Sequence, residues 1–465
     1  MNDSQLIPVI DRFLMQADLN RDRPAMEGLS YLGLARQVCG LSSQLSGARV
    51  LIACKQGPNA YAAMLASLHA GKTYAPINVE APIARQLLIC EQFQPDVVIG
   101  DETTPIVLRG ERFLTVGAET DPFPAHNSNA PAYVIFTSGS TGVPKGVVIS
   151  RHAMDHYINW VIPALGLTPD ARVSQHPNIG FDFSVMDIFG SLASGAQLFP
   201  IVTLKDRLFP VDAIQRLKLT HWISVPSVVD LMFRGKGAQL GDLPDLEQMV
   251  FCGEPLLPHH LDKLFRVAPG LRVMNTYGPT EATVSVTSLQ LNRENWSEFS
   301  DSSIALGEAI PGMAITLAGE NPNEGEIIIS GPQVADGYWR DPERTANAFK
   351  GKSYRTGDWA KRIGGSIYFC ERIDRQVKWL GHRIELGEID NELQAATGNL
   401  AVTILQADGL VGVVEATDVD PSAIQRELRQ KLPDYMIPAR IVAIEMLPRN
   451  LNDKIDHAAI AALLQ

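Results

Sequence analysis

A loop rich in hydroxyl groups and glycine lies between two apolar runs. Residues 133–150 read YVIFTSGSTGVPKGVVIS, and the flanks at 133–136 and 147–149 predict two buried strands. Glycine lets backbone N–H groups approach an anion closely, while hydroxyls and a lysine add further donors and positive charge. The loop is therefore predicted to bind a polyphosphate. The predicted phosphate-binding residues are Thr137, Ser138, Gly139, Ser140, Thr141, Gly142 and Lys145.

The composition of this loop argues against two simpler interpretations. A polar hairpin turn needs two to five residues and no such density of donors. The P-loop of strand–loop–helix NTPases has a different spacing, because Lys145 here follows Gly142 by three residues and is itself followed by glycine.

Two carboxylates interrupt an apolar stretch near the middle of the chain. Residues 181–189 read FDFSVMDIF, and an acid in such surroundings is costly unless it meets a cation. One interpretation is structural: Asp182 would cap a helix and Asp187 would lie on the outer side of that helix. The other is that Asp182 pairs with the ammonium group of a substrate.

A second group of polar residues surrounds two turns. Residues 275–281, NTYGPTE, combine an amide, an aromatic ring, a hydroxyl and a carboxylate around a Gly-Pro turn. Because Mg²⁺ prefers one or two carboxylates together with phosphate oxygens, Glu281 is a candidate ligand. In residues 354–358, YRTGD, the final carboxylate can accept the two hydroxyls of a ribose. The simple alternative for both segments is a polar turn.

These motifs resemble those of the adenylate-forming superfamily of acyl-CoA synthetases, luciferases and the adenylation domains of nonribosomal peptide synthesis. The resemblance rests on TSGSTGVPKGV at 137–147 and on NTYGPTE, and it extends through the chain to Lys454. It implies a reaction in which ATP activates a carboxylate as an acyl adenylate that is then passed to a thiol.

The resemblance also implies the fold. We expect an α/β protein with a large N-terminal adenylation domain of layered α/β subdomains, residues 1–373, and a small mobile α+β C-terminal lid domain, residues 374–465. The apolar runs at 50–53 and 96–100 predict strands and residues 59–70 a helix, which is typical of α/β folds. In the tail, Asp420 is predicted to cap a helix whose first residue is Pro421.

The roles of individual residues follow from the same resemblance. The implied adenine and ribose contacts are Asn275, Thr276, Tyr277, Asp358 and Arg372, and the implied catalytic residues are Lys454, Glu281 and Thr280. Thr280 would meet phosphate and Glu281 would hold Mg²⁺. Lys454 would bridge the attacking carboxylate and the α-phosphate. Asp374 would be the hinge, and Gly381 would belong to the loop that approaches the pantetheine arm. For Arg372, a surface ion pair with a neighbouring acid is the alternative.

The amino-acid pocket is projected from the family's pocket positions. Its residues are Asp182, Phe183, Met186, Ser224, Val250, Cys252, Thr276, Val284 and Ser285. Bulky Phe183 and Met186 predict a small cavity, and no second charged group stands beside Asp182. The segments FCGEPL and MNTYGPTEATVSVT look most like D-alanine–carrier protein ligases. We therefore expect a small amino acid, with D-alanine favoured and L-alanine, glycine, serine or proline possible.

The composition limits the partners. The chain has 465 residues with 40 Lys+Arg against 52 Asp+Glu, a net charge of −12, which argues against nucleic-acid binding. No apolar run approaches the roughly 20 residues of a membrane span, so we expect a cytoplasmic enzyme without membrane insertion. Because no carrier domain follows Gln465, the thiol is expected on a separate, stand-alone phosphopantetheinylated carrier protein or on coenzyme A.

Two other functions compete with this interpretation. An acyl- or aryl-CoA ligase would use the same adenylate chemistry, but its substrate would give Asp182 no cation to meet. A non-catalytic ATP-binding homologue remains open because Asn78, Glu371 and Asp453 depart from the family motifs. The family's charged residues argue against that homologue: Lys145, Glu281, Asp358, Arg372 and Lys454.

Overall fold

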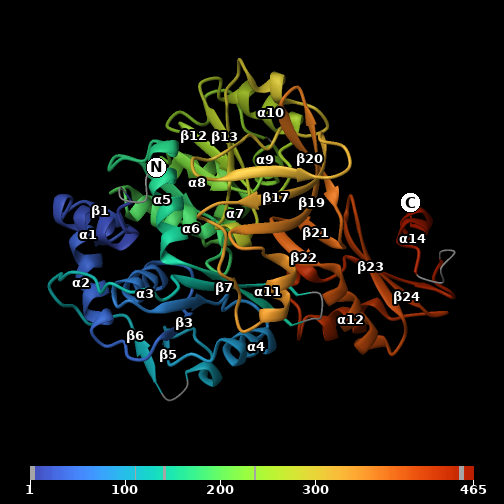
Figure 1. The fold of residues 1–465 in the computed structure, drawn as a ribbon, viewed down its shortest axis with the longest axis horizontal. Helices are drawn as coiled ribbons and strands as arrows, with labels where there is room; N and C mark the ends of the chain where they lie inside the picture. The colour runs from blue at the N-terminus through green and yellow to red at the C-terminus, as the bar shows by residue number, and fades with distance from the viewer. Residues whose placement is uncertain (1–5, 110–111, 140–142, 235–236, 450–454, 465) are drawn as a thin grey trace. The chain divides into compact units, whose positions relative to one another are not determined.

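The computed structural model describes residues 6–109, 112–139, 143–234, 237–449 and 455–464, and its backbone divides into two compact units (Figure 1). Unit 1 comprises Met1–Asn78, Phe93–Phe136 and Gly146–Ile373, and unit 2 comprises Val79–Gln92, Thr137–Lys145 and Asp374–Gln465. The last boundary between the units, between Ile373 and Asp374, coincides with the domain boundary predicted from the sequence. Two earlier segments, Val79–Gln92 and Thr137–Lys145, also group with the C-terminal part. The functional division into a core and a mobile lid stays a prediction.

Unit 1 begins with two helices and a short strand pair: α1 (Val9–Leu19), β1 (Pro24–Met26), β2 (Leu29–Ser30) and α2 (Tyr31–Ser42). The first large sheet follows, in the order β18-β8-β7-β4-β3-β5-β6. Its strands are β3 (Arg49–Ala53), β4 (Thr73–Pro76), β5 (Val97–Gly100), β6 (Phe113–Thr115), β7 (Tyr133–Thr137), β8 (Lys145–Ile149) and β18 (Gly337–Tyr338). Strand β3 runs parallel to both β4 and β5, and the intervening helices are α3 (Pro58–His69) and α4 (Ile83–Phe93). Parallel strands need such crossovers, so the predicted alternation of strands and helices is confirmed.

The second sheet of unit 1 has the order β10-β9-β11-β12-β13-β14-β15. Its strands are β9 (Arg172–Gln175), β10 (Gln197–Pro200), β11 (His221–Ser224), β12 (Gln248–Phe251), β13 (Arg272–Tyr277), β14 (Thr287–Leu291) and β15 (Glu308–Ala309). The first five in the order run parallel, and β14 is antiparallel to β13. The carboxyl ends of parallel strands meet at one edge of a sheet, which is where ligands bind in open α/β folds.

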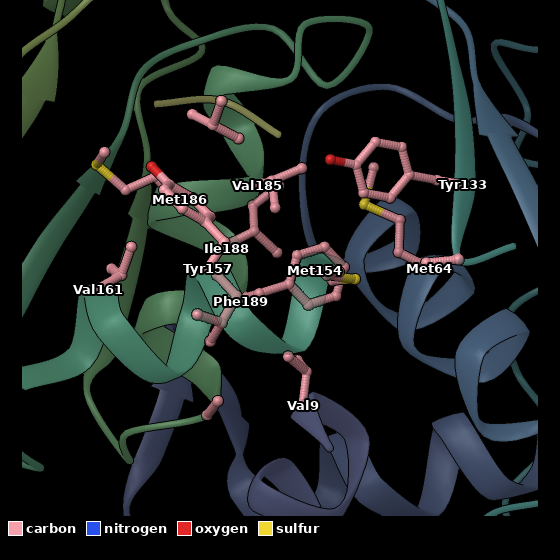
Figure 2. Packing of buried hydrophobic residues seen from close by; sticks show 14 of the residues in the cluster. Val9, Met64, Tyr133, Met154, Tyr157, Val161, Val185, Met186, Ile188 and Phe189 are labelled. Atoms are coloured by element: carbon pink, nitrogen blue, oxygen red, sulfur yellow. The ribbon is translucent and has the colours of Figure 1, made fainter. Parts of the chain in front are cut away.

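Helices precede and separate the strands of this sheet along the chain. They are α5 (Arg151–Leu165), α6 (Phe183–Leu192), α7 (Leu204–Leu208), α8 (Pro210–Leu217), α9 (Val228–Met232) and α10 (Pro258–Val267). Helices α5 and α6 pack on each other within the largest apolar cluster of unit 1. Figure 2 shows this packing, with Met154 and Tyr157 projecting from α5 and Met186 and Phe189 from α6.

A third sheet, antiparallel, completes unit 1. Its strands are β16 (Ala314–Ala318), β17 (Glu324–Ser330), β19 (Ser353–Ile363) and β20 (Ser366–Arg372), and α11 (Pro342–Ala348) precedes β19. Strands β19 and β20 form a hairpin around Gly364 and Gly365.

Unit 2 contains a two-stranded hairpin and a three-stranded sheet. The strands are β21 (Gln376–Trp379), β22 (His382–Glu385), β23 (Ala401–Gln406), β24 (Gly409–Glu415) and β25 (Arg440–Ile444), and the helices of the C-terminal segment are α12 (Leu386–Thr397), α13 (Pro421–Leu428) and α14 (His457–Leu463). The predicted cap is confirmed: Asp420 Oδ1 accepts the backbone N–H groups of Ser422 and Ala423 at the start of α13. The α/β fold class predicted from the sequence is confirmed. Among the described residues, no helix combines the length and apolar character needed to cross a bilayer.

Candidate active site

The nucleotide-side cluster, Tyr277, Asp358 and Arg372, joins two sheets of unit 1. Tyr277 ends β13, whereas Asp358 and Arg372 pair across β19 and β20. The Tyr277 hydroxyl donates to Asp358 Oδ2 at 2.5 Å, and Arg372 Nη1 donates to Asp358 Oδ1 at 2.7 Å. Burial and the Asp358 carboxylate raise the pKa of Tyr277, so its phenol stays protonated and can donate. Hydrogen bonds thus hold three of the predicted adenine and ribose contacts together in the interior of unit 1. Arg372 is not confined to the surface.

The other two predicted nucleotide contacts lie on β13. Asn275 Nδ2 donates to the carbonyl oxygen of Ala305 at 2.8 Å, which orients the amide so that Oδ1 is the atom suited to an adenine amino group. Thr276 Oγ1 donates to the carbonyl oxygen of Phe251 at 2.9 Å, which joins β13 to the neighbouring β12. Both side chains are buried and fixed by backbone groups.

Glu281 is a fully buried carboxylate in the 3₁₀ turn η3 (Thr280–Ala282). Its Oε1 accepts a hydrogen bond from the Tyr338 hydroxyl at 2.9 Å, and Tyr338 lies on β18 of the first sheet. The Glu281 carboxylate is a suitable ligand for Mg²⁺, because that ion prefers carboxylate and phosphate oxygens. Thr280 begins the same turn and is half-buried, so the two predicted catalytic residues of unit 1 are adjacent.

Three of the predicted amino-acid residues, Ser224, Val250 and Cys252, lie at the carboxyl ends of strands of the second sheet. Ser224 ends β11 and pairs with Phe251, the last residue of β12, and Cys252 follows directly. Val250 lies one residue earlier on β12. The sequence missed one neighbour: His176, just after β9, lies with its Nδ1 3.0 Å from Ser224 Oγ. Burial lowers the pKa of His176 to about 4, so the ring is neutral near pH 7.

Asp182 and Asp187 occupy different environments around α6. Asp182 is half-buried at the N-cap position, but its side chain makes no capping hydrogen bond, which weakens the purely structural interpretation. The expectation that Asp187 lies on the outer side of the helix is wrong. Asp187 is fully buried, and burial raises its pKa well above the usual range. Phe183 and Met186, the bulky pocket residues, are also buried on this helix.

The last two predicted pocket residues are Val284, which lies in a strained turn, and Ser285, which follows it. Thr283 and Val284 have φ of 56° and 71°, a left-handed conformation that β-branched residues rarely adopt. The turn is held by Thr283 Oγ1, which donates to the carbonyl oxygen of Gln333 at 2.7 Å. A Cβ on Gly278 would lie 2.5 Å from the Cα of Ser285, so glycine is required for this close approach. Such strain persists where the surroundings enforce it and often marks a functional site.

The described part of the predicted phosphate loop lies in unit 2. A Cβ on Gly139 would lie 2.1 Å from the carbonyl oxygen of Val143, so only glycine fits there. Ser138 Oγ donates to the carbonyl oxygen of Arg383 at 2.7 Å, and Lys145 Nζ lies 3.8 Å from Glu385 Oε1. Lys145 therefore faces an anionic oxygen within its own unit. Three predicted residues of this loop, Ser140, Thr141 and Gly142, lie outside the described residues, as does Lys454.

The predicted hinge and the predicted thiol-transfer loop also lie in unit 2. Asp374 is exposed, and its Oδ1 accepts the backbone N–H of Gln376 at 3.1 Å. Leu380 and Gly381 join β21 to β22 with φ of 50° and 78°. Positive φ at both central residues is the signature of a type I′ hairpin, so Gly381 occupies a tight turn.

The sequence comparisons agree with this geometry. A family model described as AMP-binding enzyme matches residues 13–339, well over half of the 465 residues. The chain belongs to the AMP-binding enzyme family. The D-alanine–D-alanyl carrier protein ligase of Listeria monocytogenes serotype 4b (strain F2365) is 32% identical, with 97% of this chain and 98% of the relative covered. The protein of the same name from Staphylococcus aureus (strain bovine RF122/ET3-1) is 30% identical, with 98% and 99% covered.

A solved structure extends the similarity to three dimensions. The Vibrio cholerae adenylation domain AlmE, in complex with glycyl-adenosine-5'-phosphate, matches with a TM-score of 0.86 and 28% identity. The match covers 98% of this chain and 97% of that domain. The adenylation-domain fold that the sequence implied is therefore confirmed.

Several residues of this AMP-binding enzyme carry contacts that sequence reasoning missed. They are Arg85, Tyr157, His176, Tyr338, Glu385 and Glu388. Arg85 and Glu388 form a buried ion pair at 2.5 Å that ties α4 to α12 within unit 2. A signal existed for the two acids, because both lie in the apolar stretch RIELGEI at 383–389 and would need partners when buried.

Proposed function

We propose that this AMP-binding enzyme uses ATP to convert a small amino acid, with D-alanine favoured, into an aminoacyl adenylate. The aminoacyl group would then pass to the phosphopantetheine thiol of a separate carrier protein, which makes the enzyme an amino acid–[carrier protein] ligase. The observation that carries the proposal is the position of Asp182 at the start of α6, on the helix that also carries the buried, neutral residues Phe183 and Met186. The names of the relatives and the glycyl adenylate bound by AlmE support a small amino acid.

The residues described above have complementary tasks in this proposal. Asp182 would pair with the substrate ammonium and so fix the carboxylate end of the amino acid. Asp358 and Arg372 would hold the ribose, with Asn275 facing the adenine amino group. The protein would act mainly by positioning the carboxylate in line with the α-phosphate and by neutralising charge, as is usual in phosphoryl and nucleotidyl transfer.

Glu281 would hold Mg²⁺ and Thr280 would contact phosphate. When bound, the ion would screen the phosphate oxygens. The loop hydroxyls and Lys145 would take the β- and γ-phosphates, which requires Lys145 to exchange its contact with Glu385 for one with phosphate. Lys454 would stabilise the charge that shifts as pyrophosphate leaves. Because ATP is the substrate, we keep a cytoplasmic location as part of this proposal.

The test is amino-acid-dependent exchange of labelled pyrophosphate into ATP. The panel contains both enantiomers of alanine and serine, with glycine, proline, an aryl acid and a fatty acid. We expect exchange with the small amino acids, strongest with D-alanine. A preference for another small amino acid would leave the proposed enzyme class unchanged and assign that amino acid as the substrate. Exchange only with acids that lack an amino group would contradict the proposal and favour an acyl- or aryl-CoA ligase.

A variant separates catalysis from binding. Lys454→Ala should lower exchange about 10²–10³-fold while ATP binding, measured by calorimetry, is retained. Unchanged exchange would remove Lys454 from the mechanism. Absence of exchange in the wild type under all conditions, with ATP still bound, would favour a non-catalytic ATP-binding homologue.

A further inference from the structure

Tyr157 brings residues of the predicted amino-acid site together, although it lies outside the pocket positions projected from the sequence. It projects from α5, and its hydroxyl is 3.1 Å from Ser285 Oγ. Both side chains are fully buried. Ser285 directly follows the strained turn at Thr283 and Val284, so the constrained backbone of that turn fixes where Ser285 lies.

The surroundings of Tyr157 connect it to the acid that would bind the substrate ammonium. Burial raises the pKa of Tyr157, the hydrogen bond with Ser285 opposes that shift, and the ionisable groups of Cys252, Asp182 and Asp187 add to it, so these groups lie within electrostatic reach of the Tyr157 hydroxyl. Tyr157 and Met186 belong to the same apolar cluster, and Figure 2 shows the ring of Tyr157 directed from α5 toward Met186 of α6. Residues from three separate segments thus lie around one phenol: α6, Cys252 and Ser285.

This arrangement sets a direction for the substrate. The ammonium and the side chain of an amino acid are bonded to the same carbon, so a substrate whose ammonium meets Asp182 would place its side chain close to that acid, among the groups that also act on Tyr157. A tyrosine ring is large and nearly rigid, with two rotatable bonds, and packed interiors do not yield to an extra methylene without cost. A side chain longer than methyl or hydroxymethyl would have to displace the ring.

We infer that Tyr157 is a specificity-determining residue: with its hydroxyl fixed by Ser285, its ring closes the far end of the amino-acid site and limits the substrate side chain to one or two heavy atoms. This inference rests on the proposed function, since it assigns a size limit to the same site.

The experiment is a substrate ladder of glycine, alanine, 2-aminobutyrate and norvaline, in the enantiomer that the wild type prefers, measured by pyrophosphate exchange. We expect Tyr157→Leu to raise the ratio of kcat/KM for norvaline over alanine at least about tenfold, because one methylene in a fitted site changes discrimination by that order. Tyr157→Phe, which keeps the ring, should change this ratio far less. Its loss of the bond to Ser285 should lower alanine use about two- to tenfold.

Tyr31 supplies the matched control. It is also a fully buried tyrosine of unit 1, but its hydroxyl donates to the carbonyl oxygens of Ser191 and Ala196. Tyr31→Leu should cost similar stability in thermal unfolding and leave the substrate ratio unchanged. A folded Tyr157→Leu with the wild-type ratio, or a shift equal to that of Tyr31→Leu, would overturn the inference.

A second variant keeps the inference testable if Tyr157→Leu does not fold. Ser285→Thr adds one methyl group at the same boundary and should lower alanine relative to glycine about tenfold. An unchanged alanine-to-glycine ratio would contradict the inference. The proposed function fails differently, because the wild type itself would then show no amino-acid-dependent exchange.

Discussion

Two buried carboxylates in unit 1 are handled in opposite ways. Asp358, in the nucleotide-side cluster, meets the Arg372 guanidinium at 2.7 Å and the Tyr277 hydroxyl at 2.5 Å. Asp187, inside α6, meets no cation, and neither of its oxygens makes a hydrogen bond of normal geometry with the described residues. Burial raises the pKa of Asp187, and the nearby Ile188 N–H and Gln175 side chain oppose the shift only in part. One acid has a cationic partner, whereas burial raises the pKa of the other.

The difference distinguishes the two regions that are predicted to hold the two substrates. Around the predicted nucleotide residues, Asp358 has a cationic partner in Arg372, which would suit a ligand that brings phosphates and a metal ion. Around the predicted amino-acid residues, burial lowers the pKa of His176 to about 4, so its ring is neutral near pH 7, and burial raises the pKa of Asp187. In the proposed function Asp182 is the group that would attract an ammonium, and the interaction would be stronger where the local dielectric is low.

Removing the cation from the nucleotide-side cluster should have the largest effect on stability. Arg372→Ala leaves Asp358 buried without its guanidinium, which typically costs about 3–5 kcal/mol. The free energy of unfolding from urea titration measures this loss. Arg21→Ala is the control, since Arg21 pairs with Asp18 on the surface and such pairs contribute about 0–1 kcal/mol. Equal losses for the two variants would mean that Asp358 does not depend on Arg372.

His176 should make the enzyme sensitive to acid. Its pKa is about 4 when folded and 6.5 when unfolded, so the unfolded chain takes up the proton first as the pH falls. Stability contributed by neutral His176 is complete above pH 6.5 and declines toward pH 4, by about 3 kcal/mol in total. His176→Gln, which does not titrate, should flatten the urea unfolding profile across this window. A variant profile parallel to that of the wild type would show that His176 is accessible to protons.

Asp187 should act with the opposite sign. Its pKa is raised in the folded state, so above its unfolded pKa of about 4 the folded chain holds a proton that the unfolded chain has lost. Wild-type stability therefore falls as the pH rises from about 4, at most by about 1.4 kcal/mol per pH unit. Asp187→Asn lacks this titration, and its stability relative to the wild type should increase with pH. A difference that is independent of pH would mean that Asp187 is ionised.

The sequence predicted the fold, and it singled out Tyr277, Asp358 and Arg372, which the structure brings together. Each of the three stands in a short motif, so it could be picked out without knowledge of its partners, and its role at a nucleotide stays a prediction. Tyr157 and His176 could not, since their partners Ser285 and Ser224 are more than 40 positions away in sequence. Asp187 was misplaced because helical spacing alone does not show that α6 is buried along its whole length, where it packs against the helices α1 and α5 and against the strands β9 and β10.

The most direct test of this division between the two sides is Asp182→Ala. We expect kcat/KM for the amino acid in pyrophosphate exchange to fall about 10²–10³-fold, because an ammonium would be left without its counter-ion. The dissociation constant of ATP should change by less than about twofold, because Tyr277 and Arg372 of the nucleotide-side cluster are held by Asp358, which this variant keeps. Equal losses of amino-acid use and ATP affinity would contradict the proposed ammonium pairing.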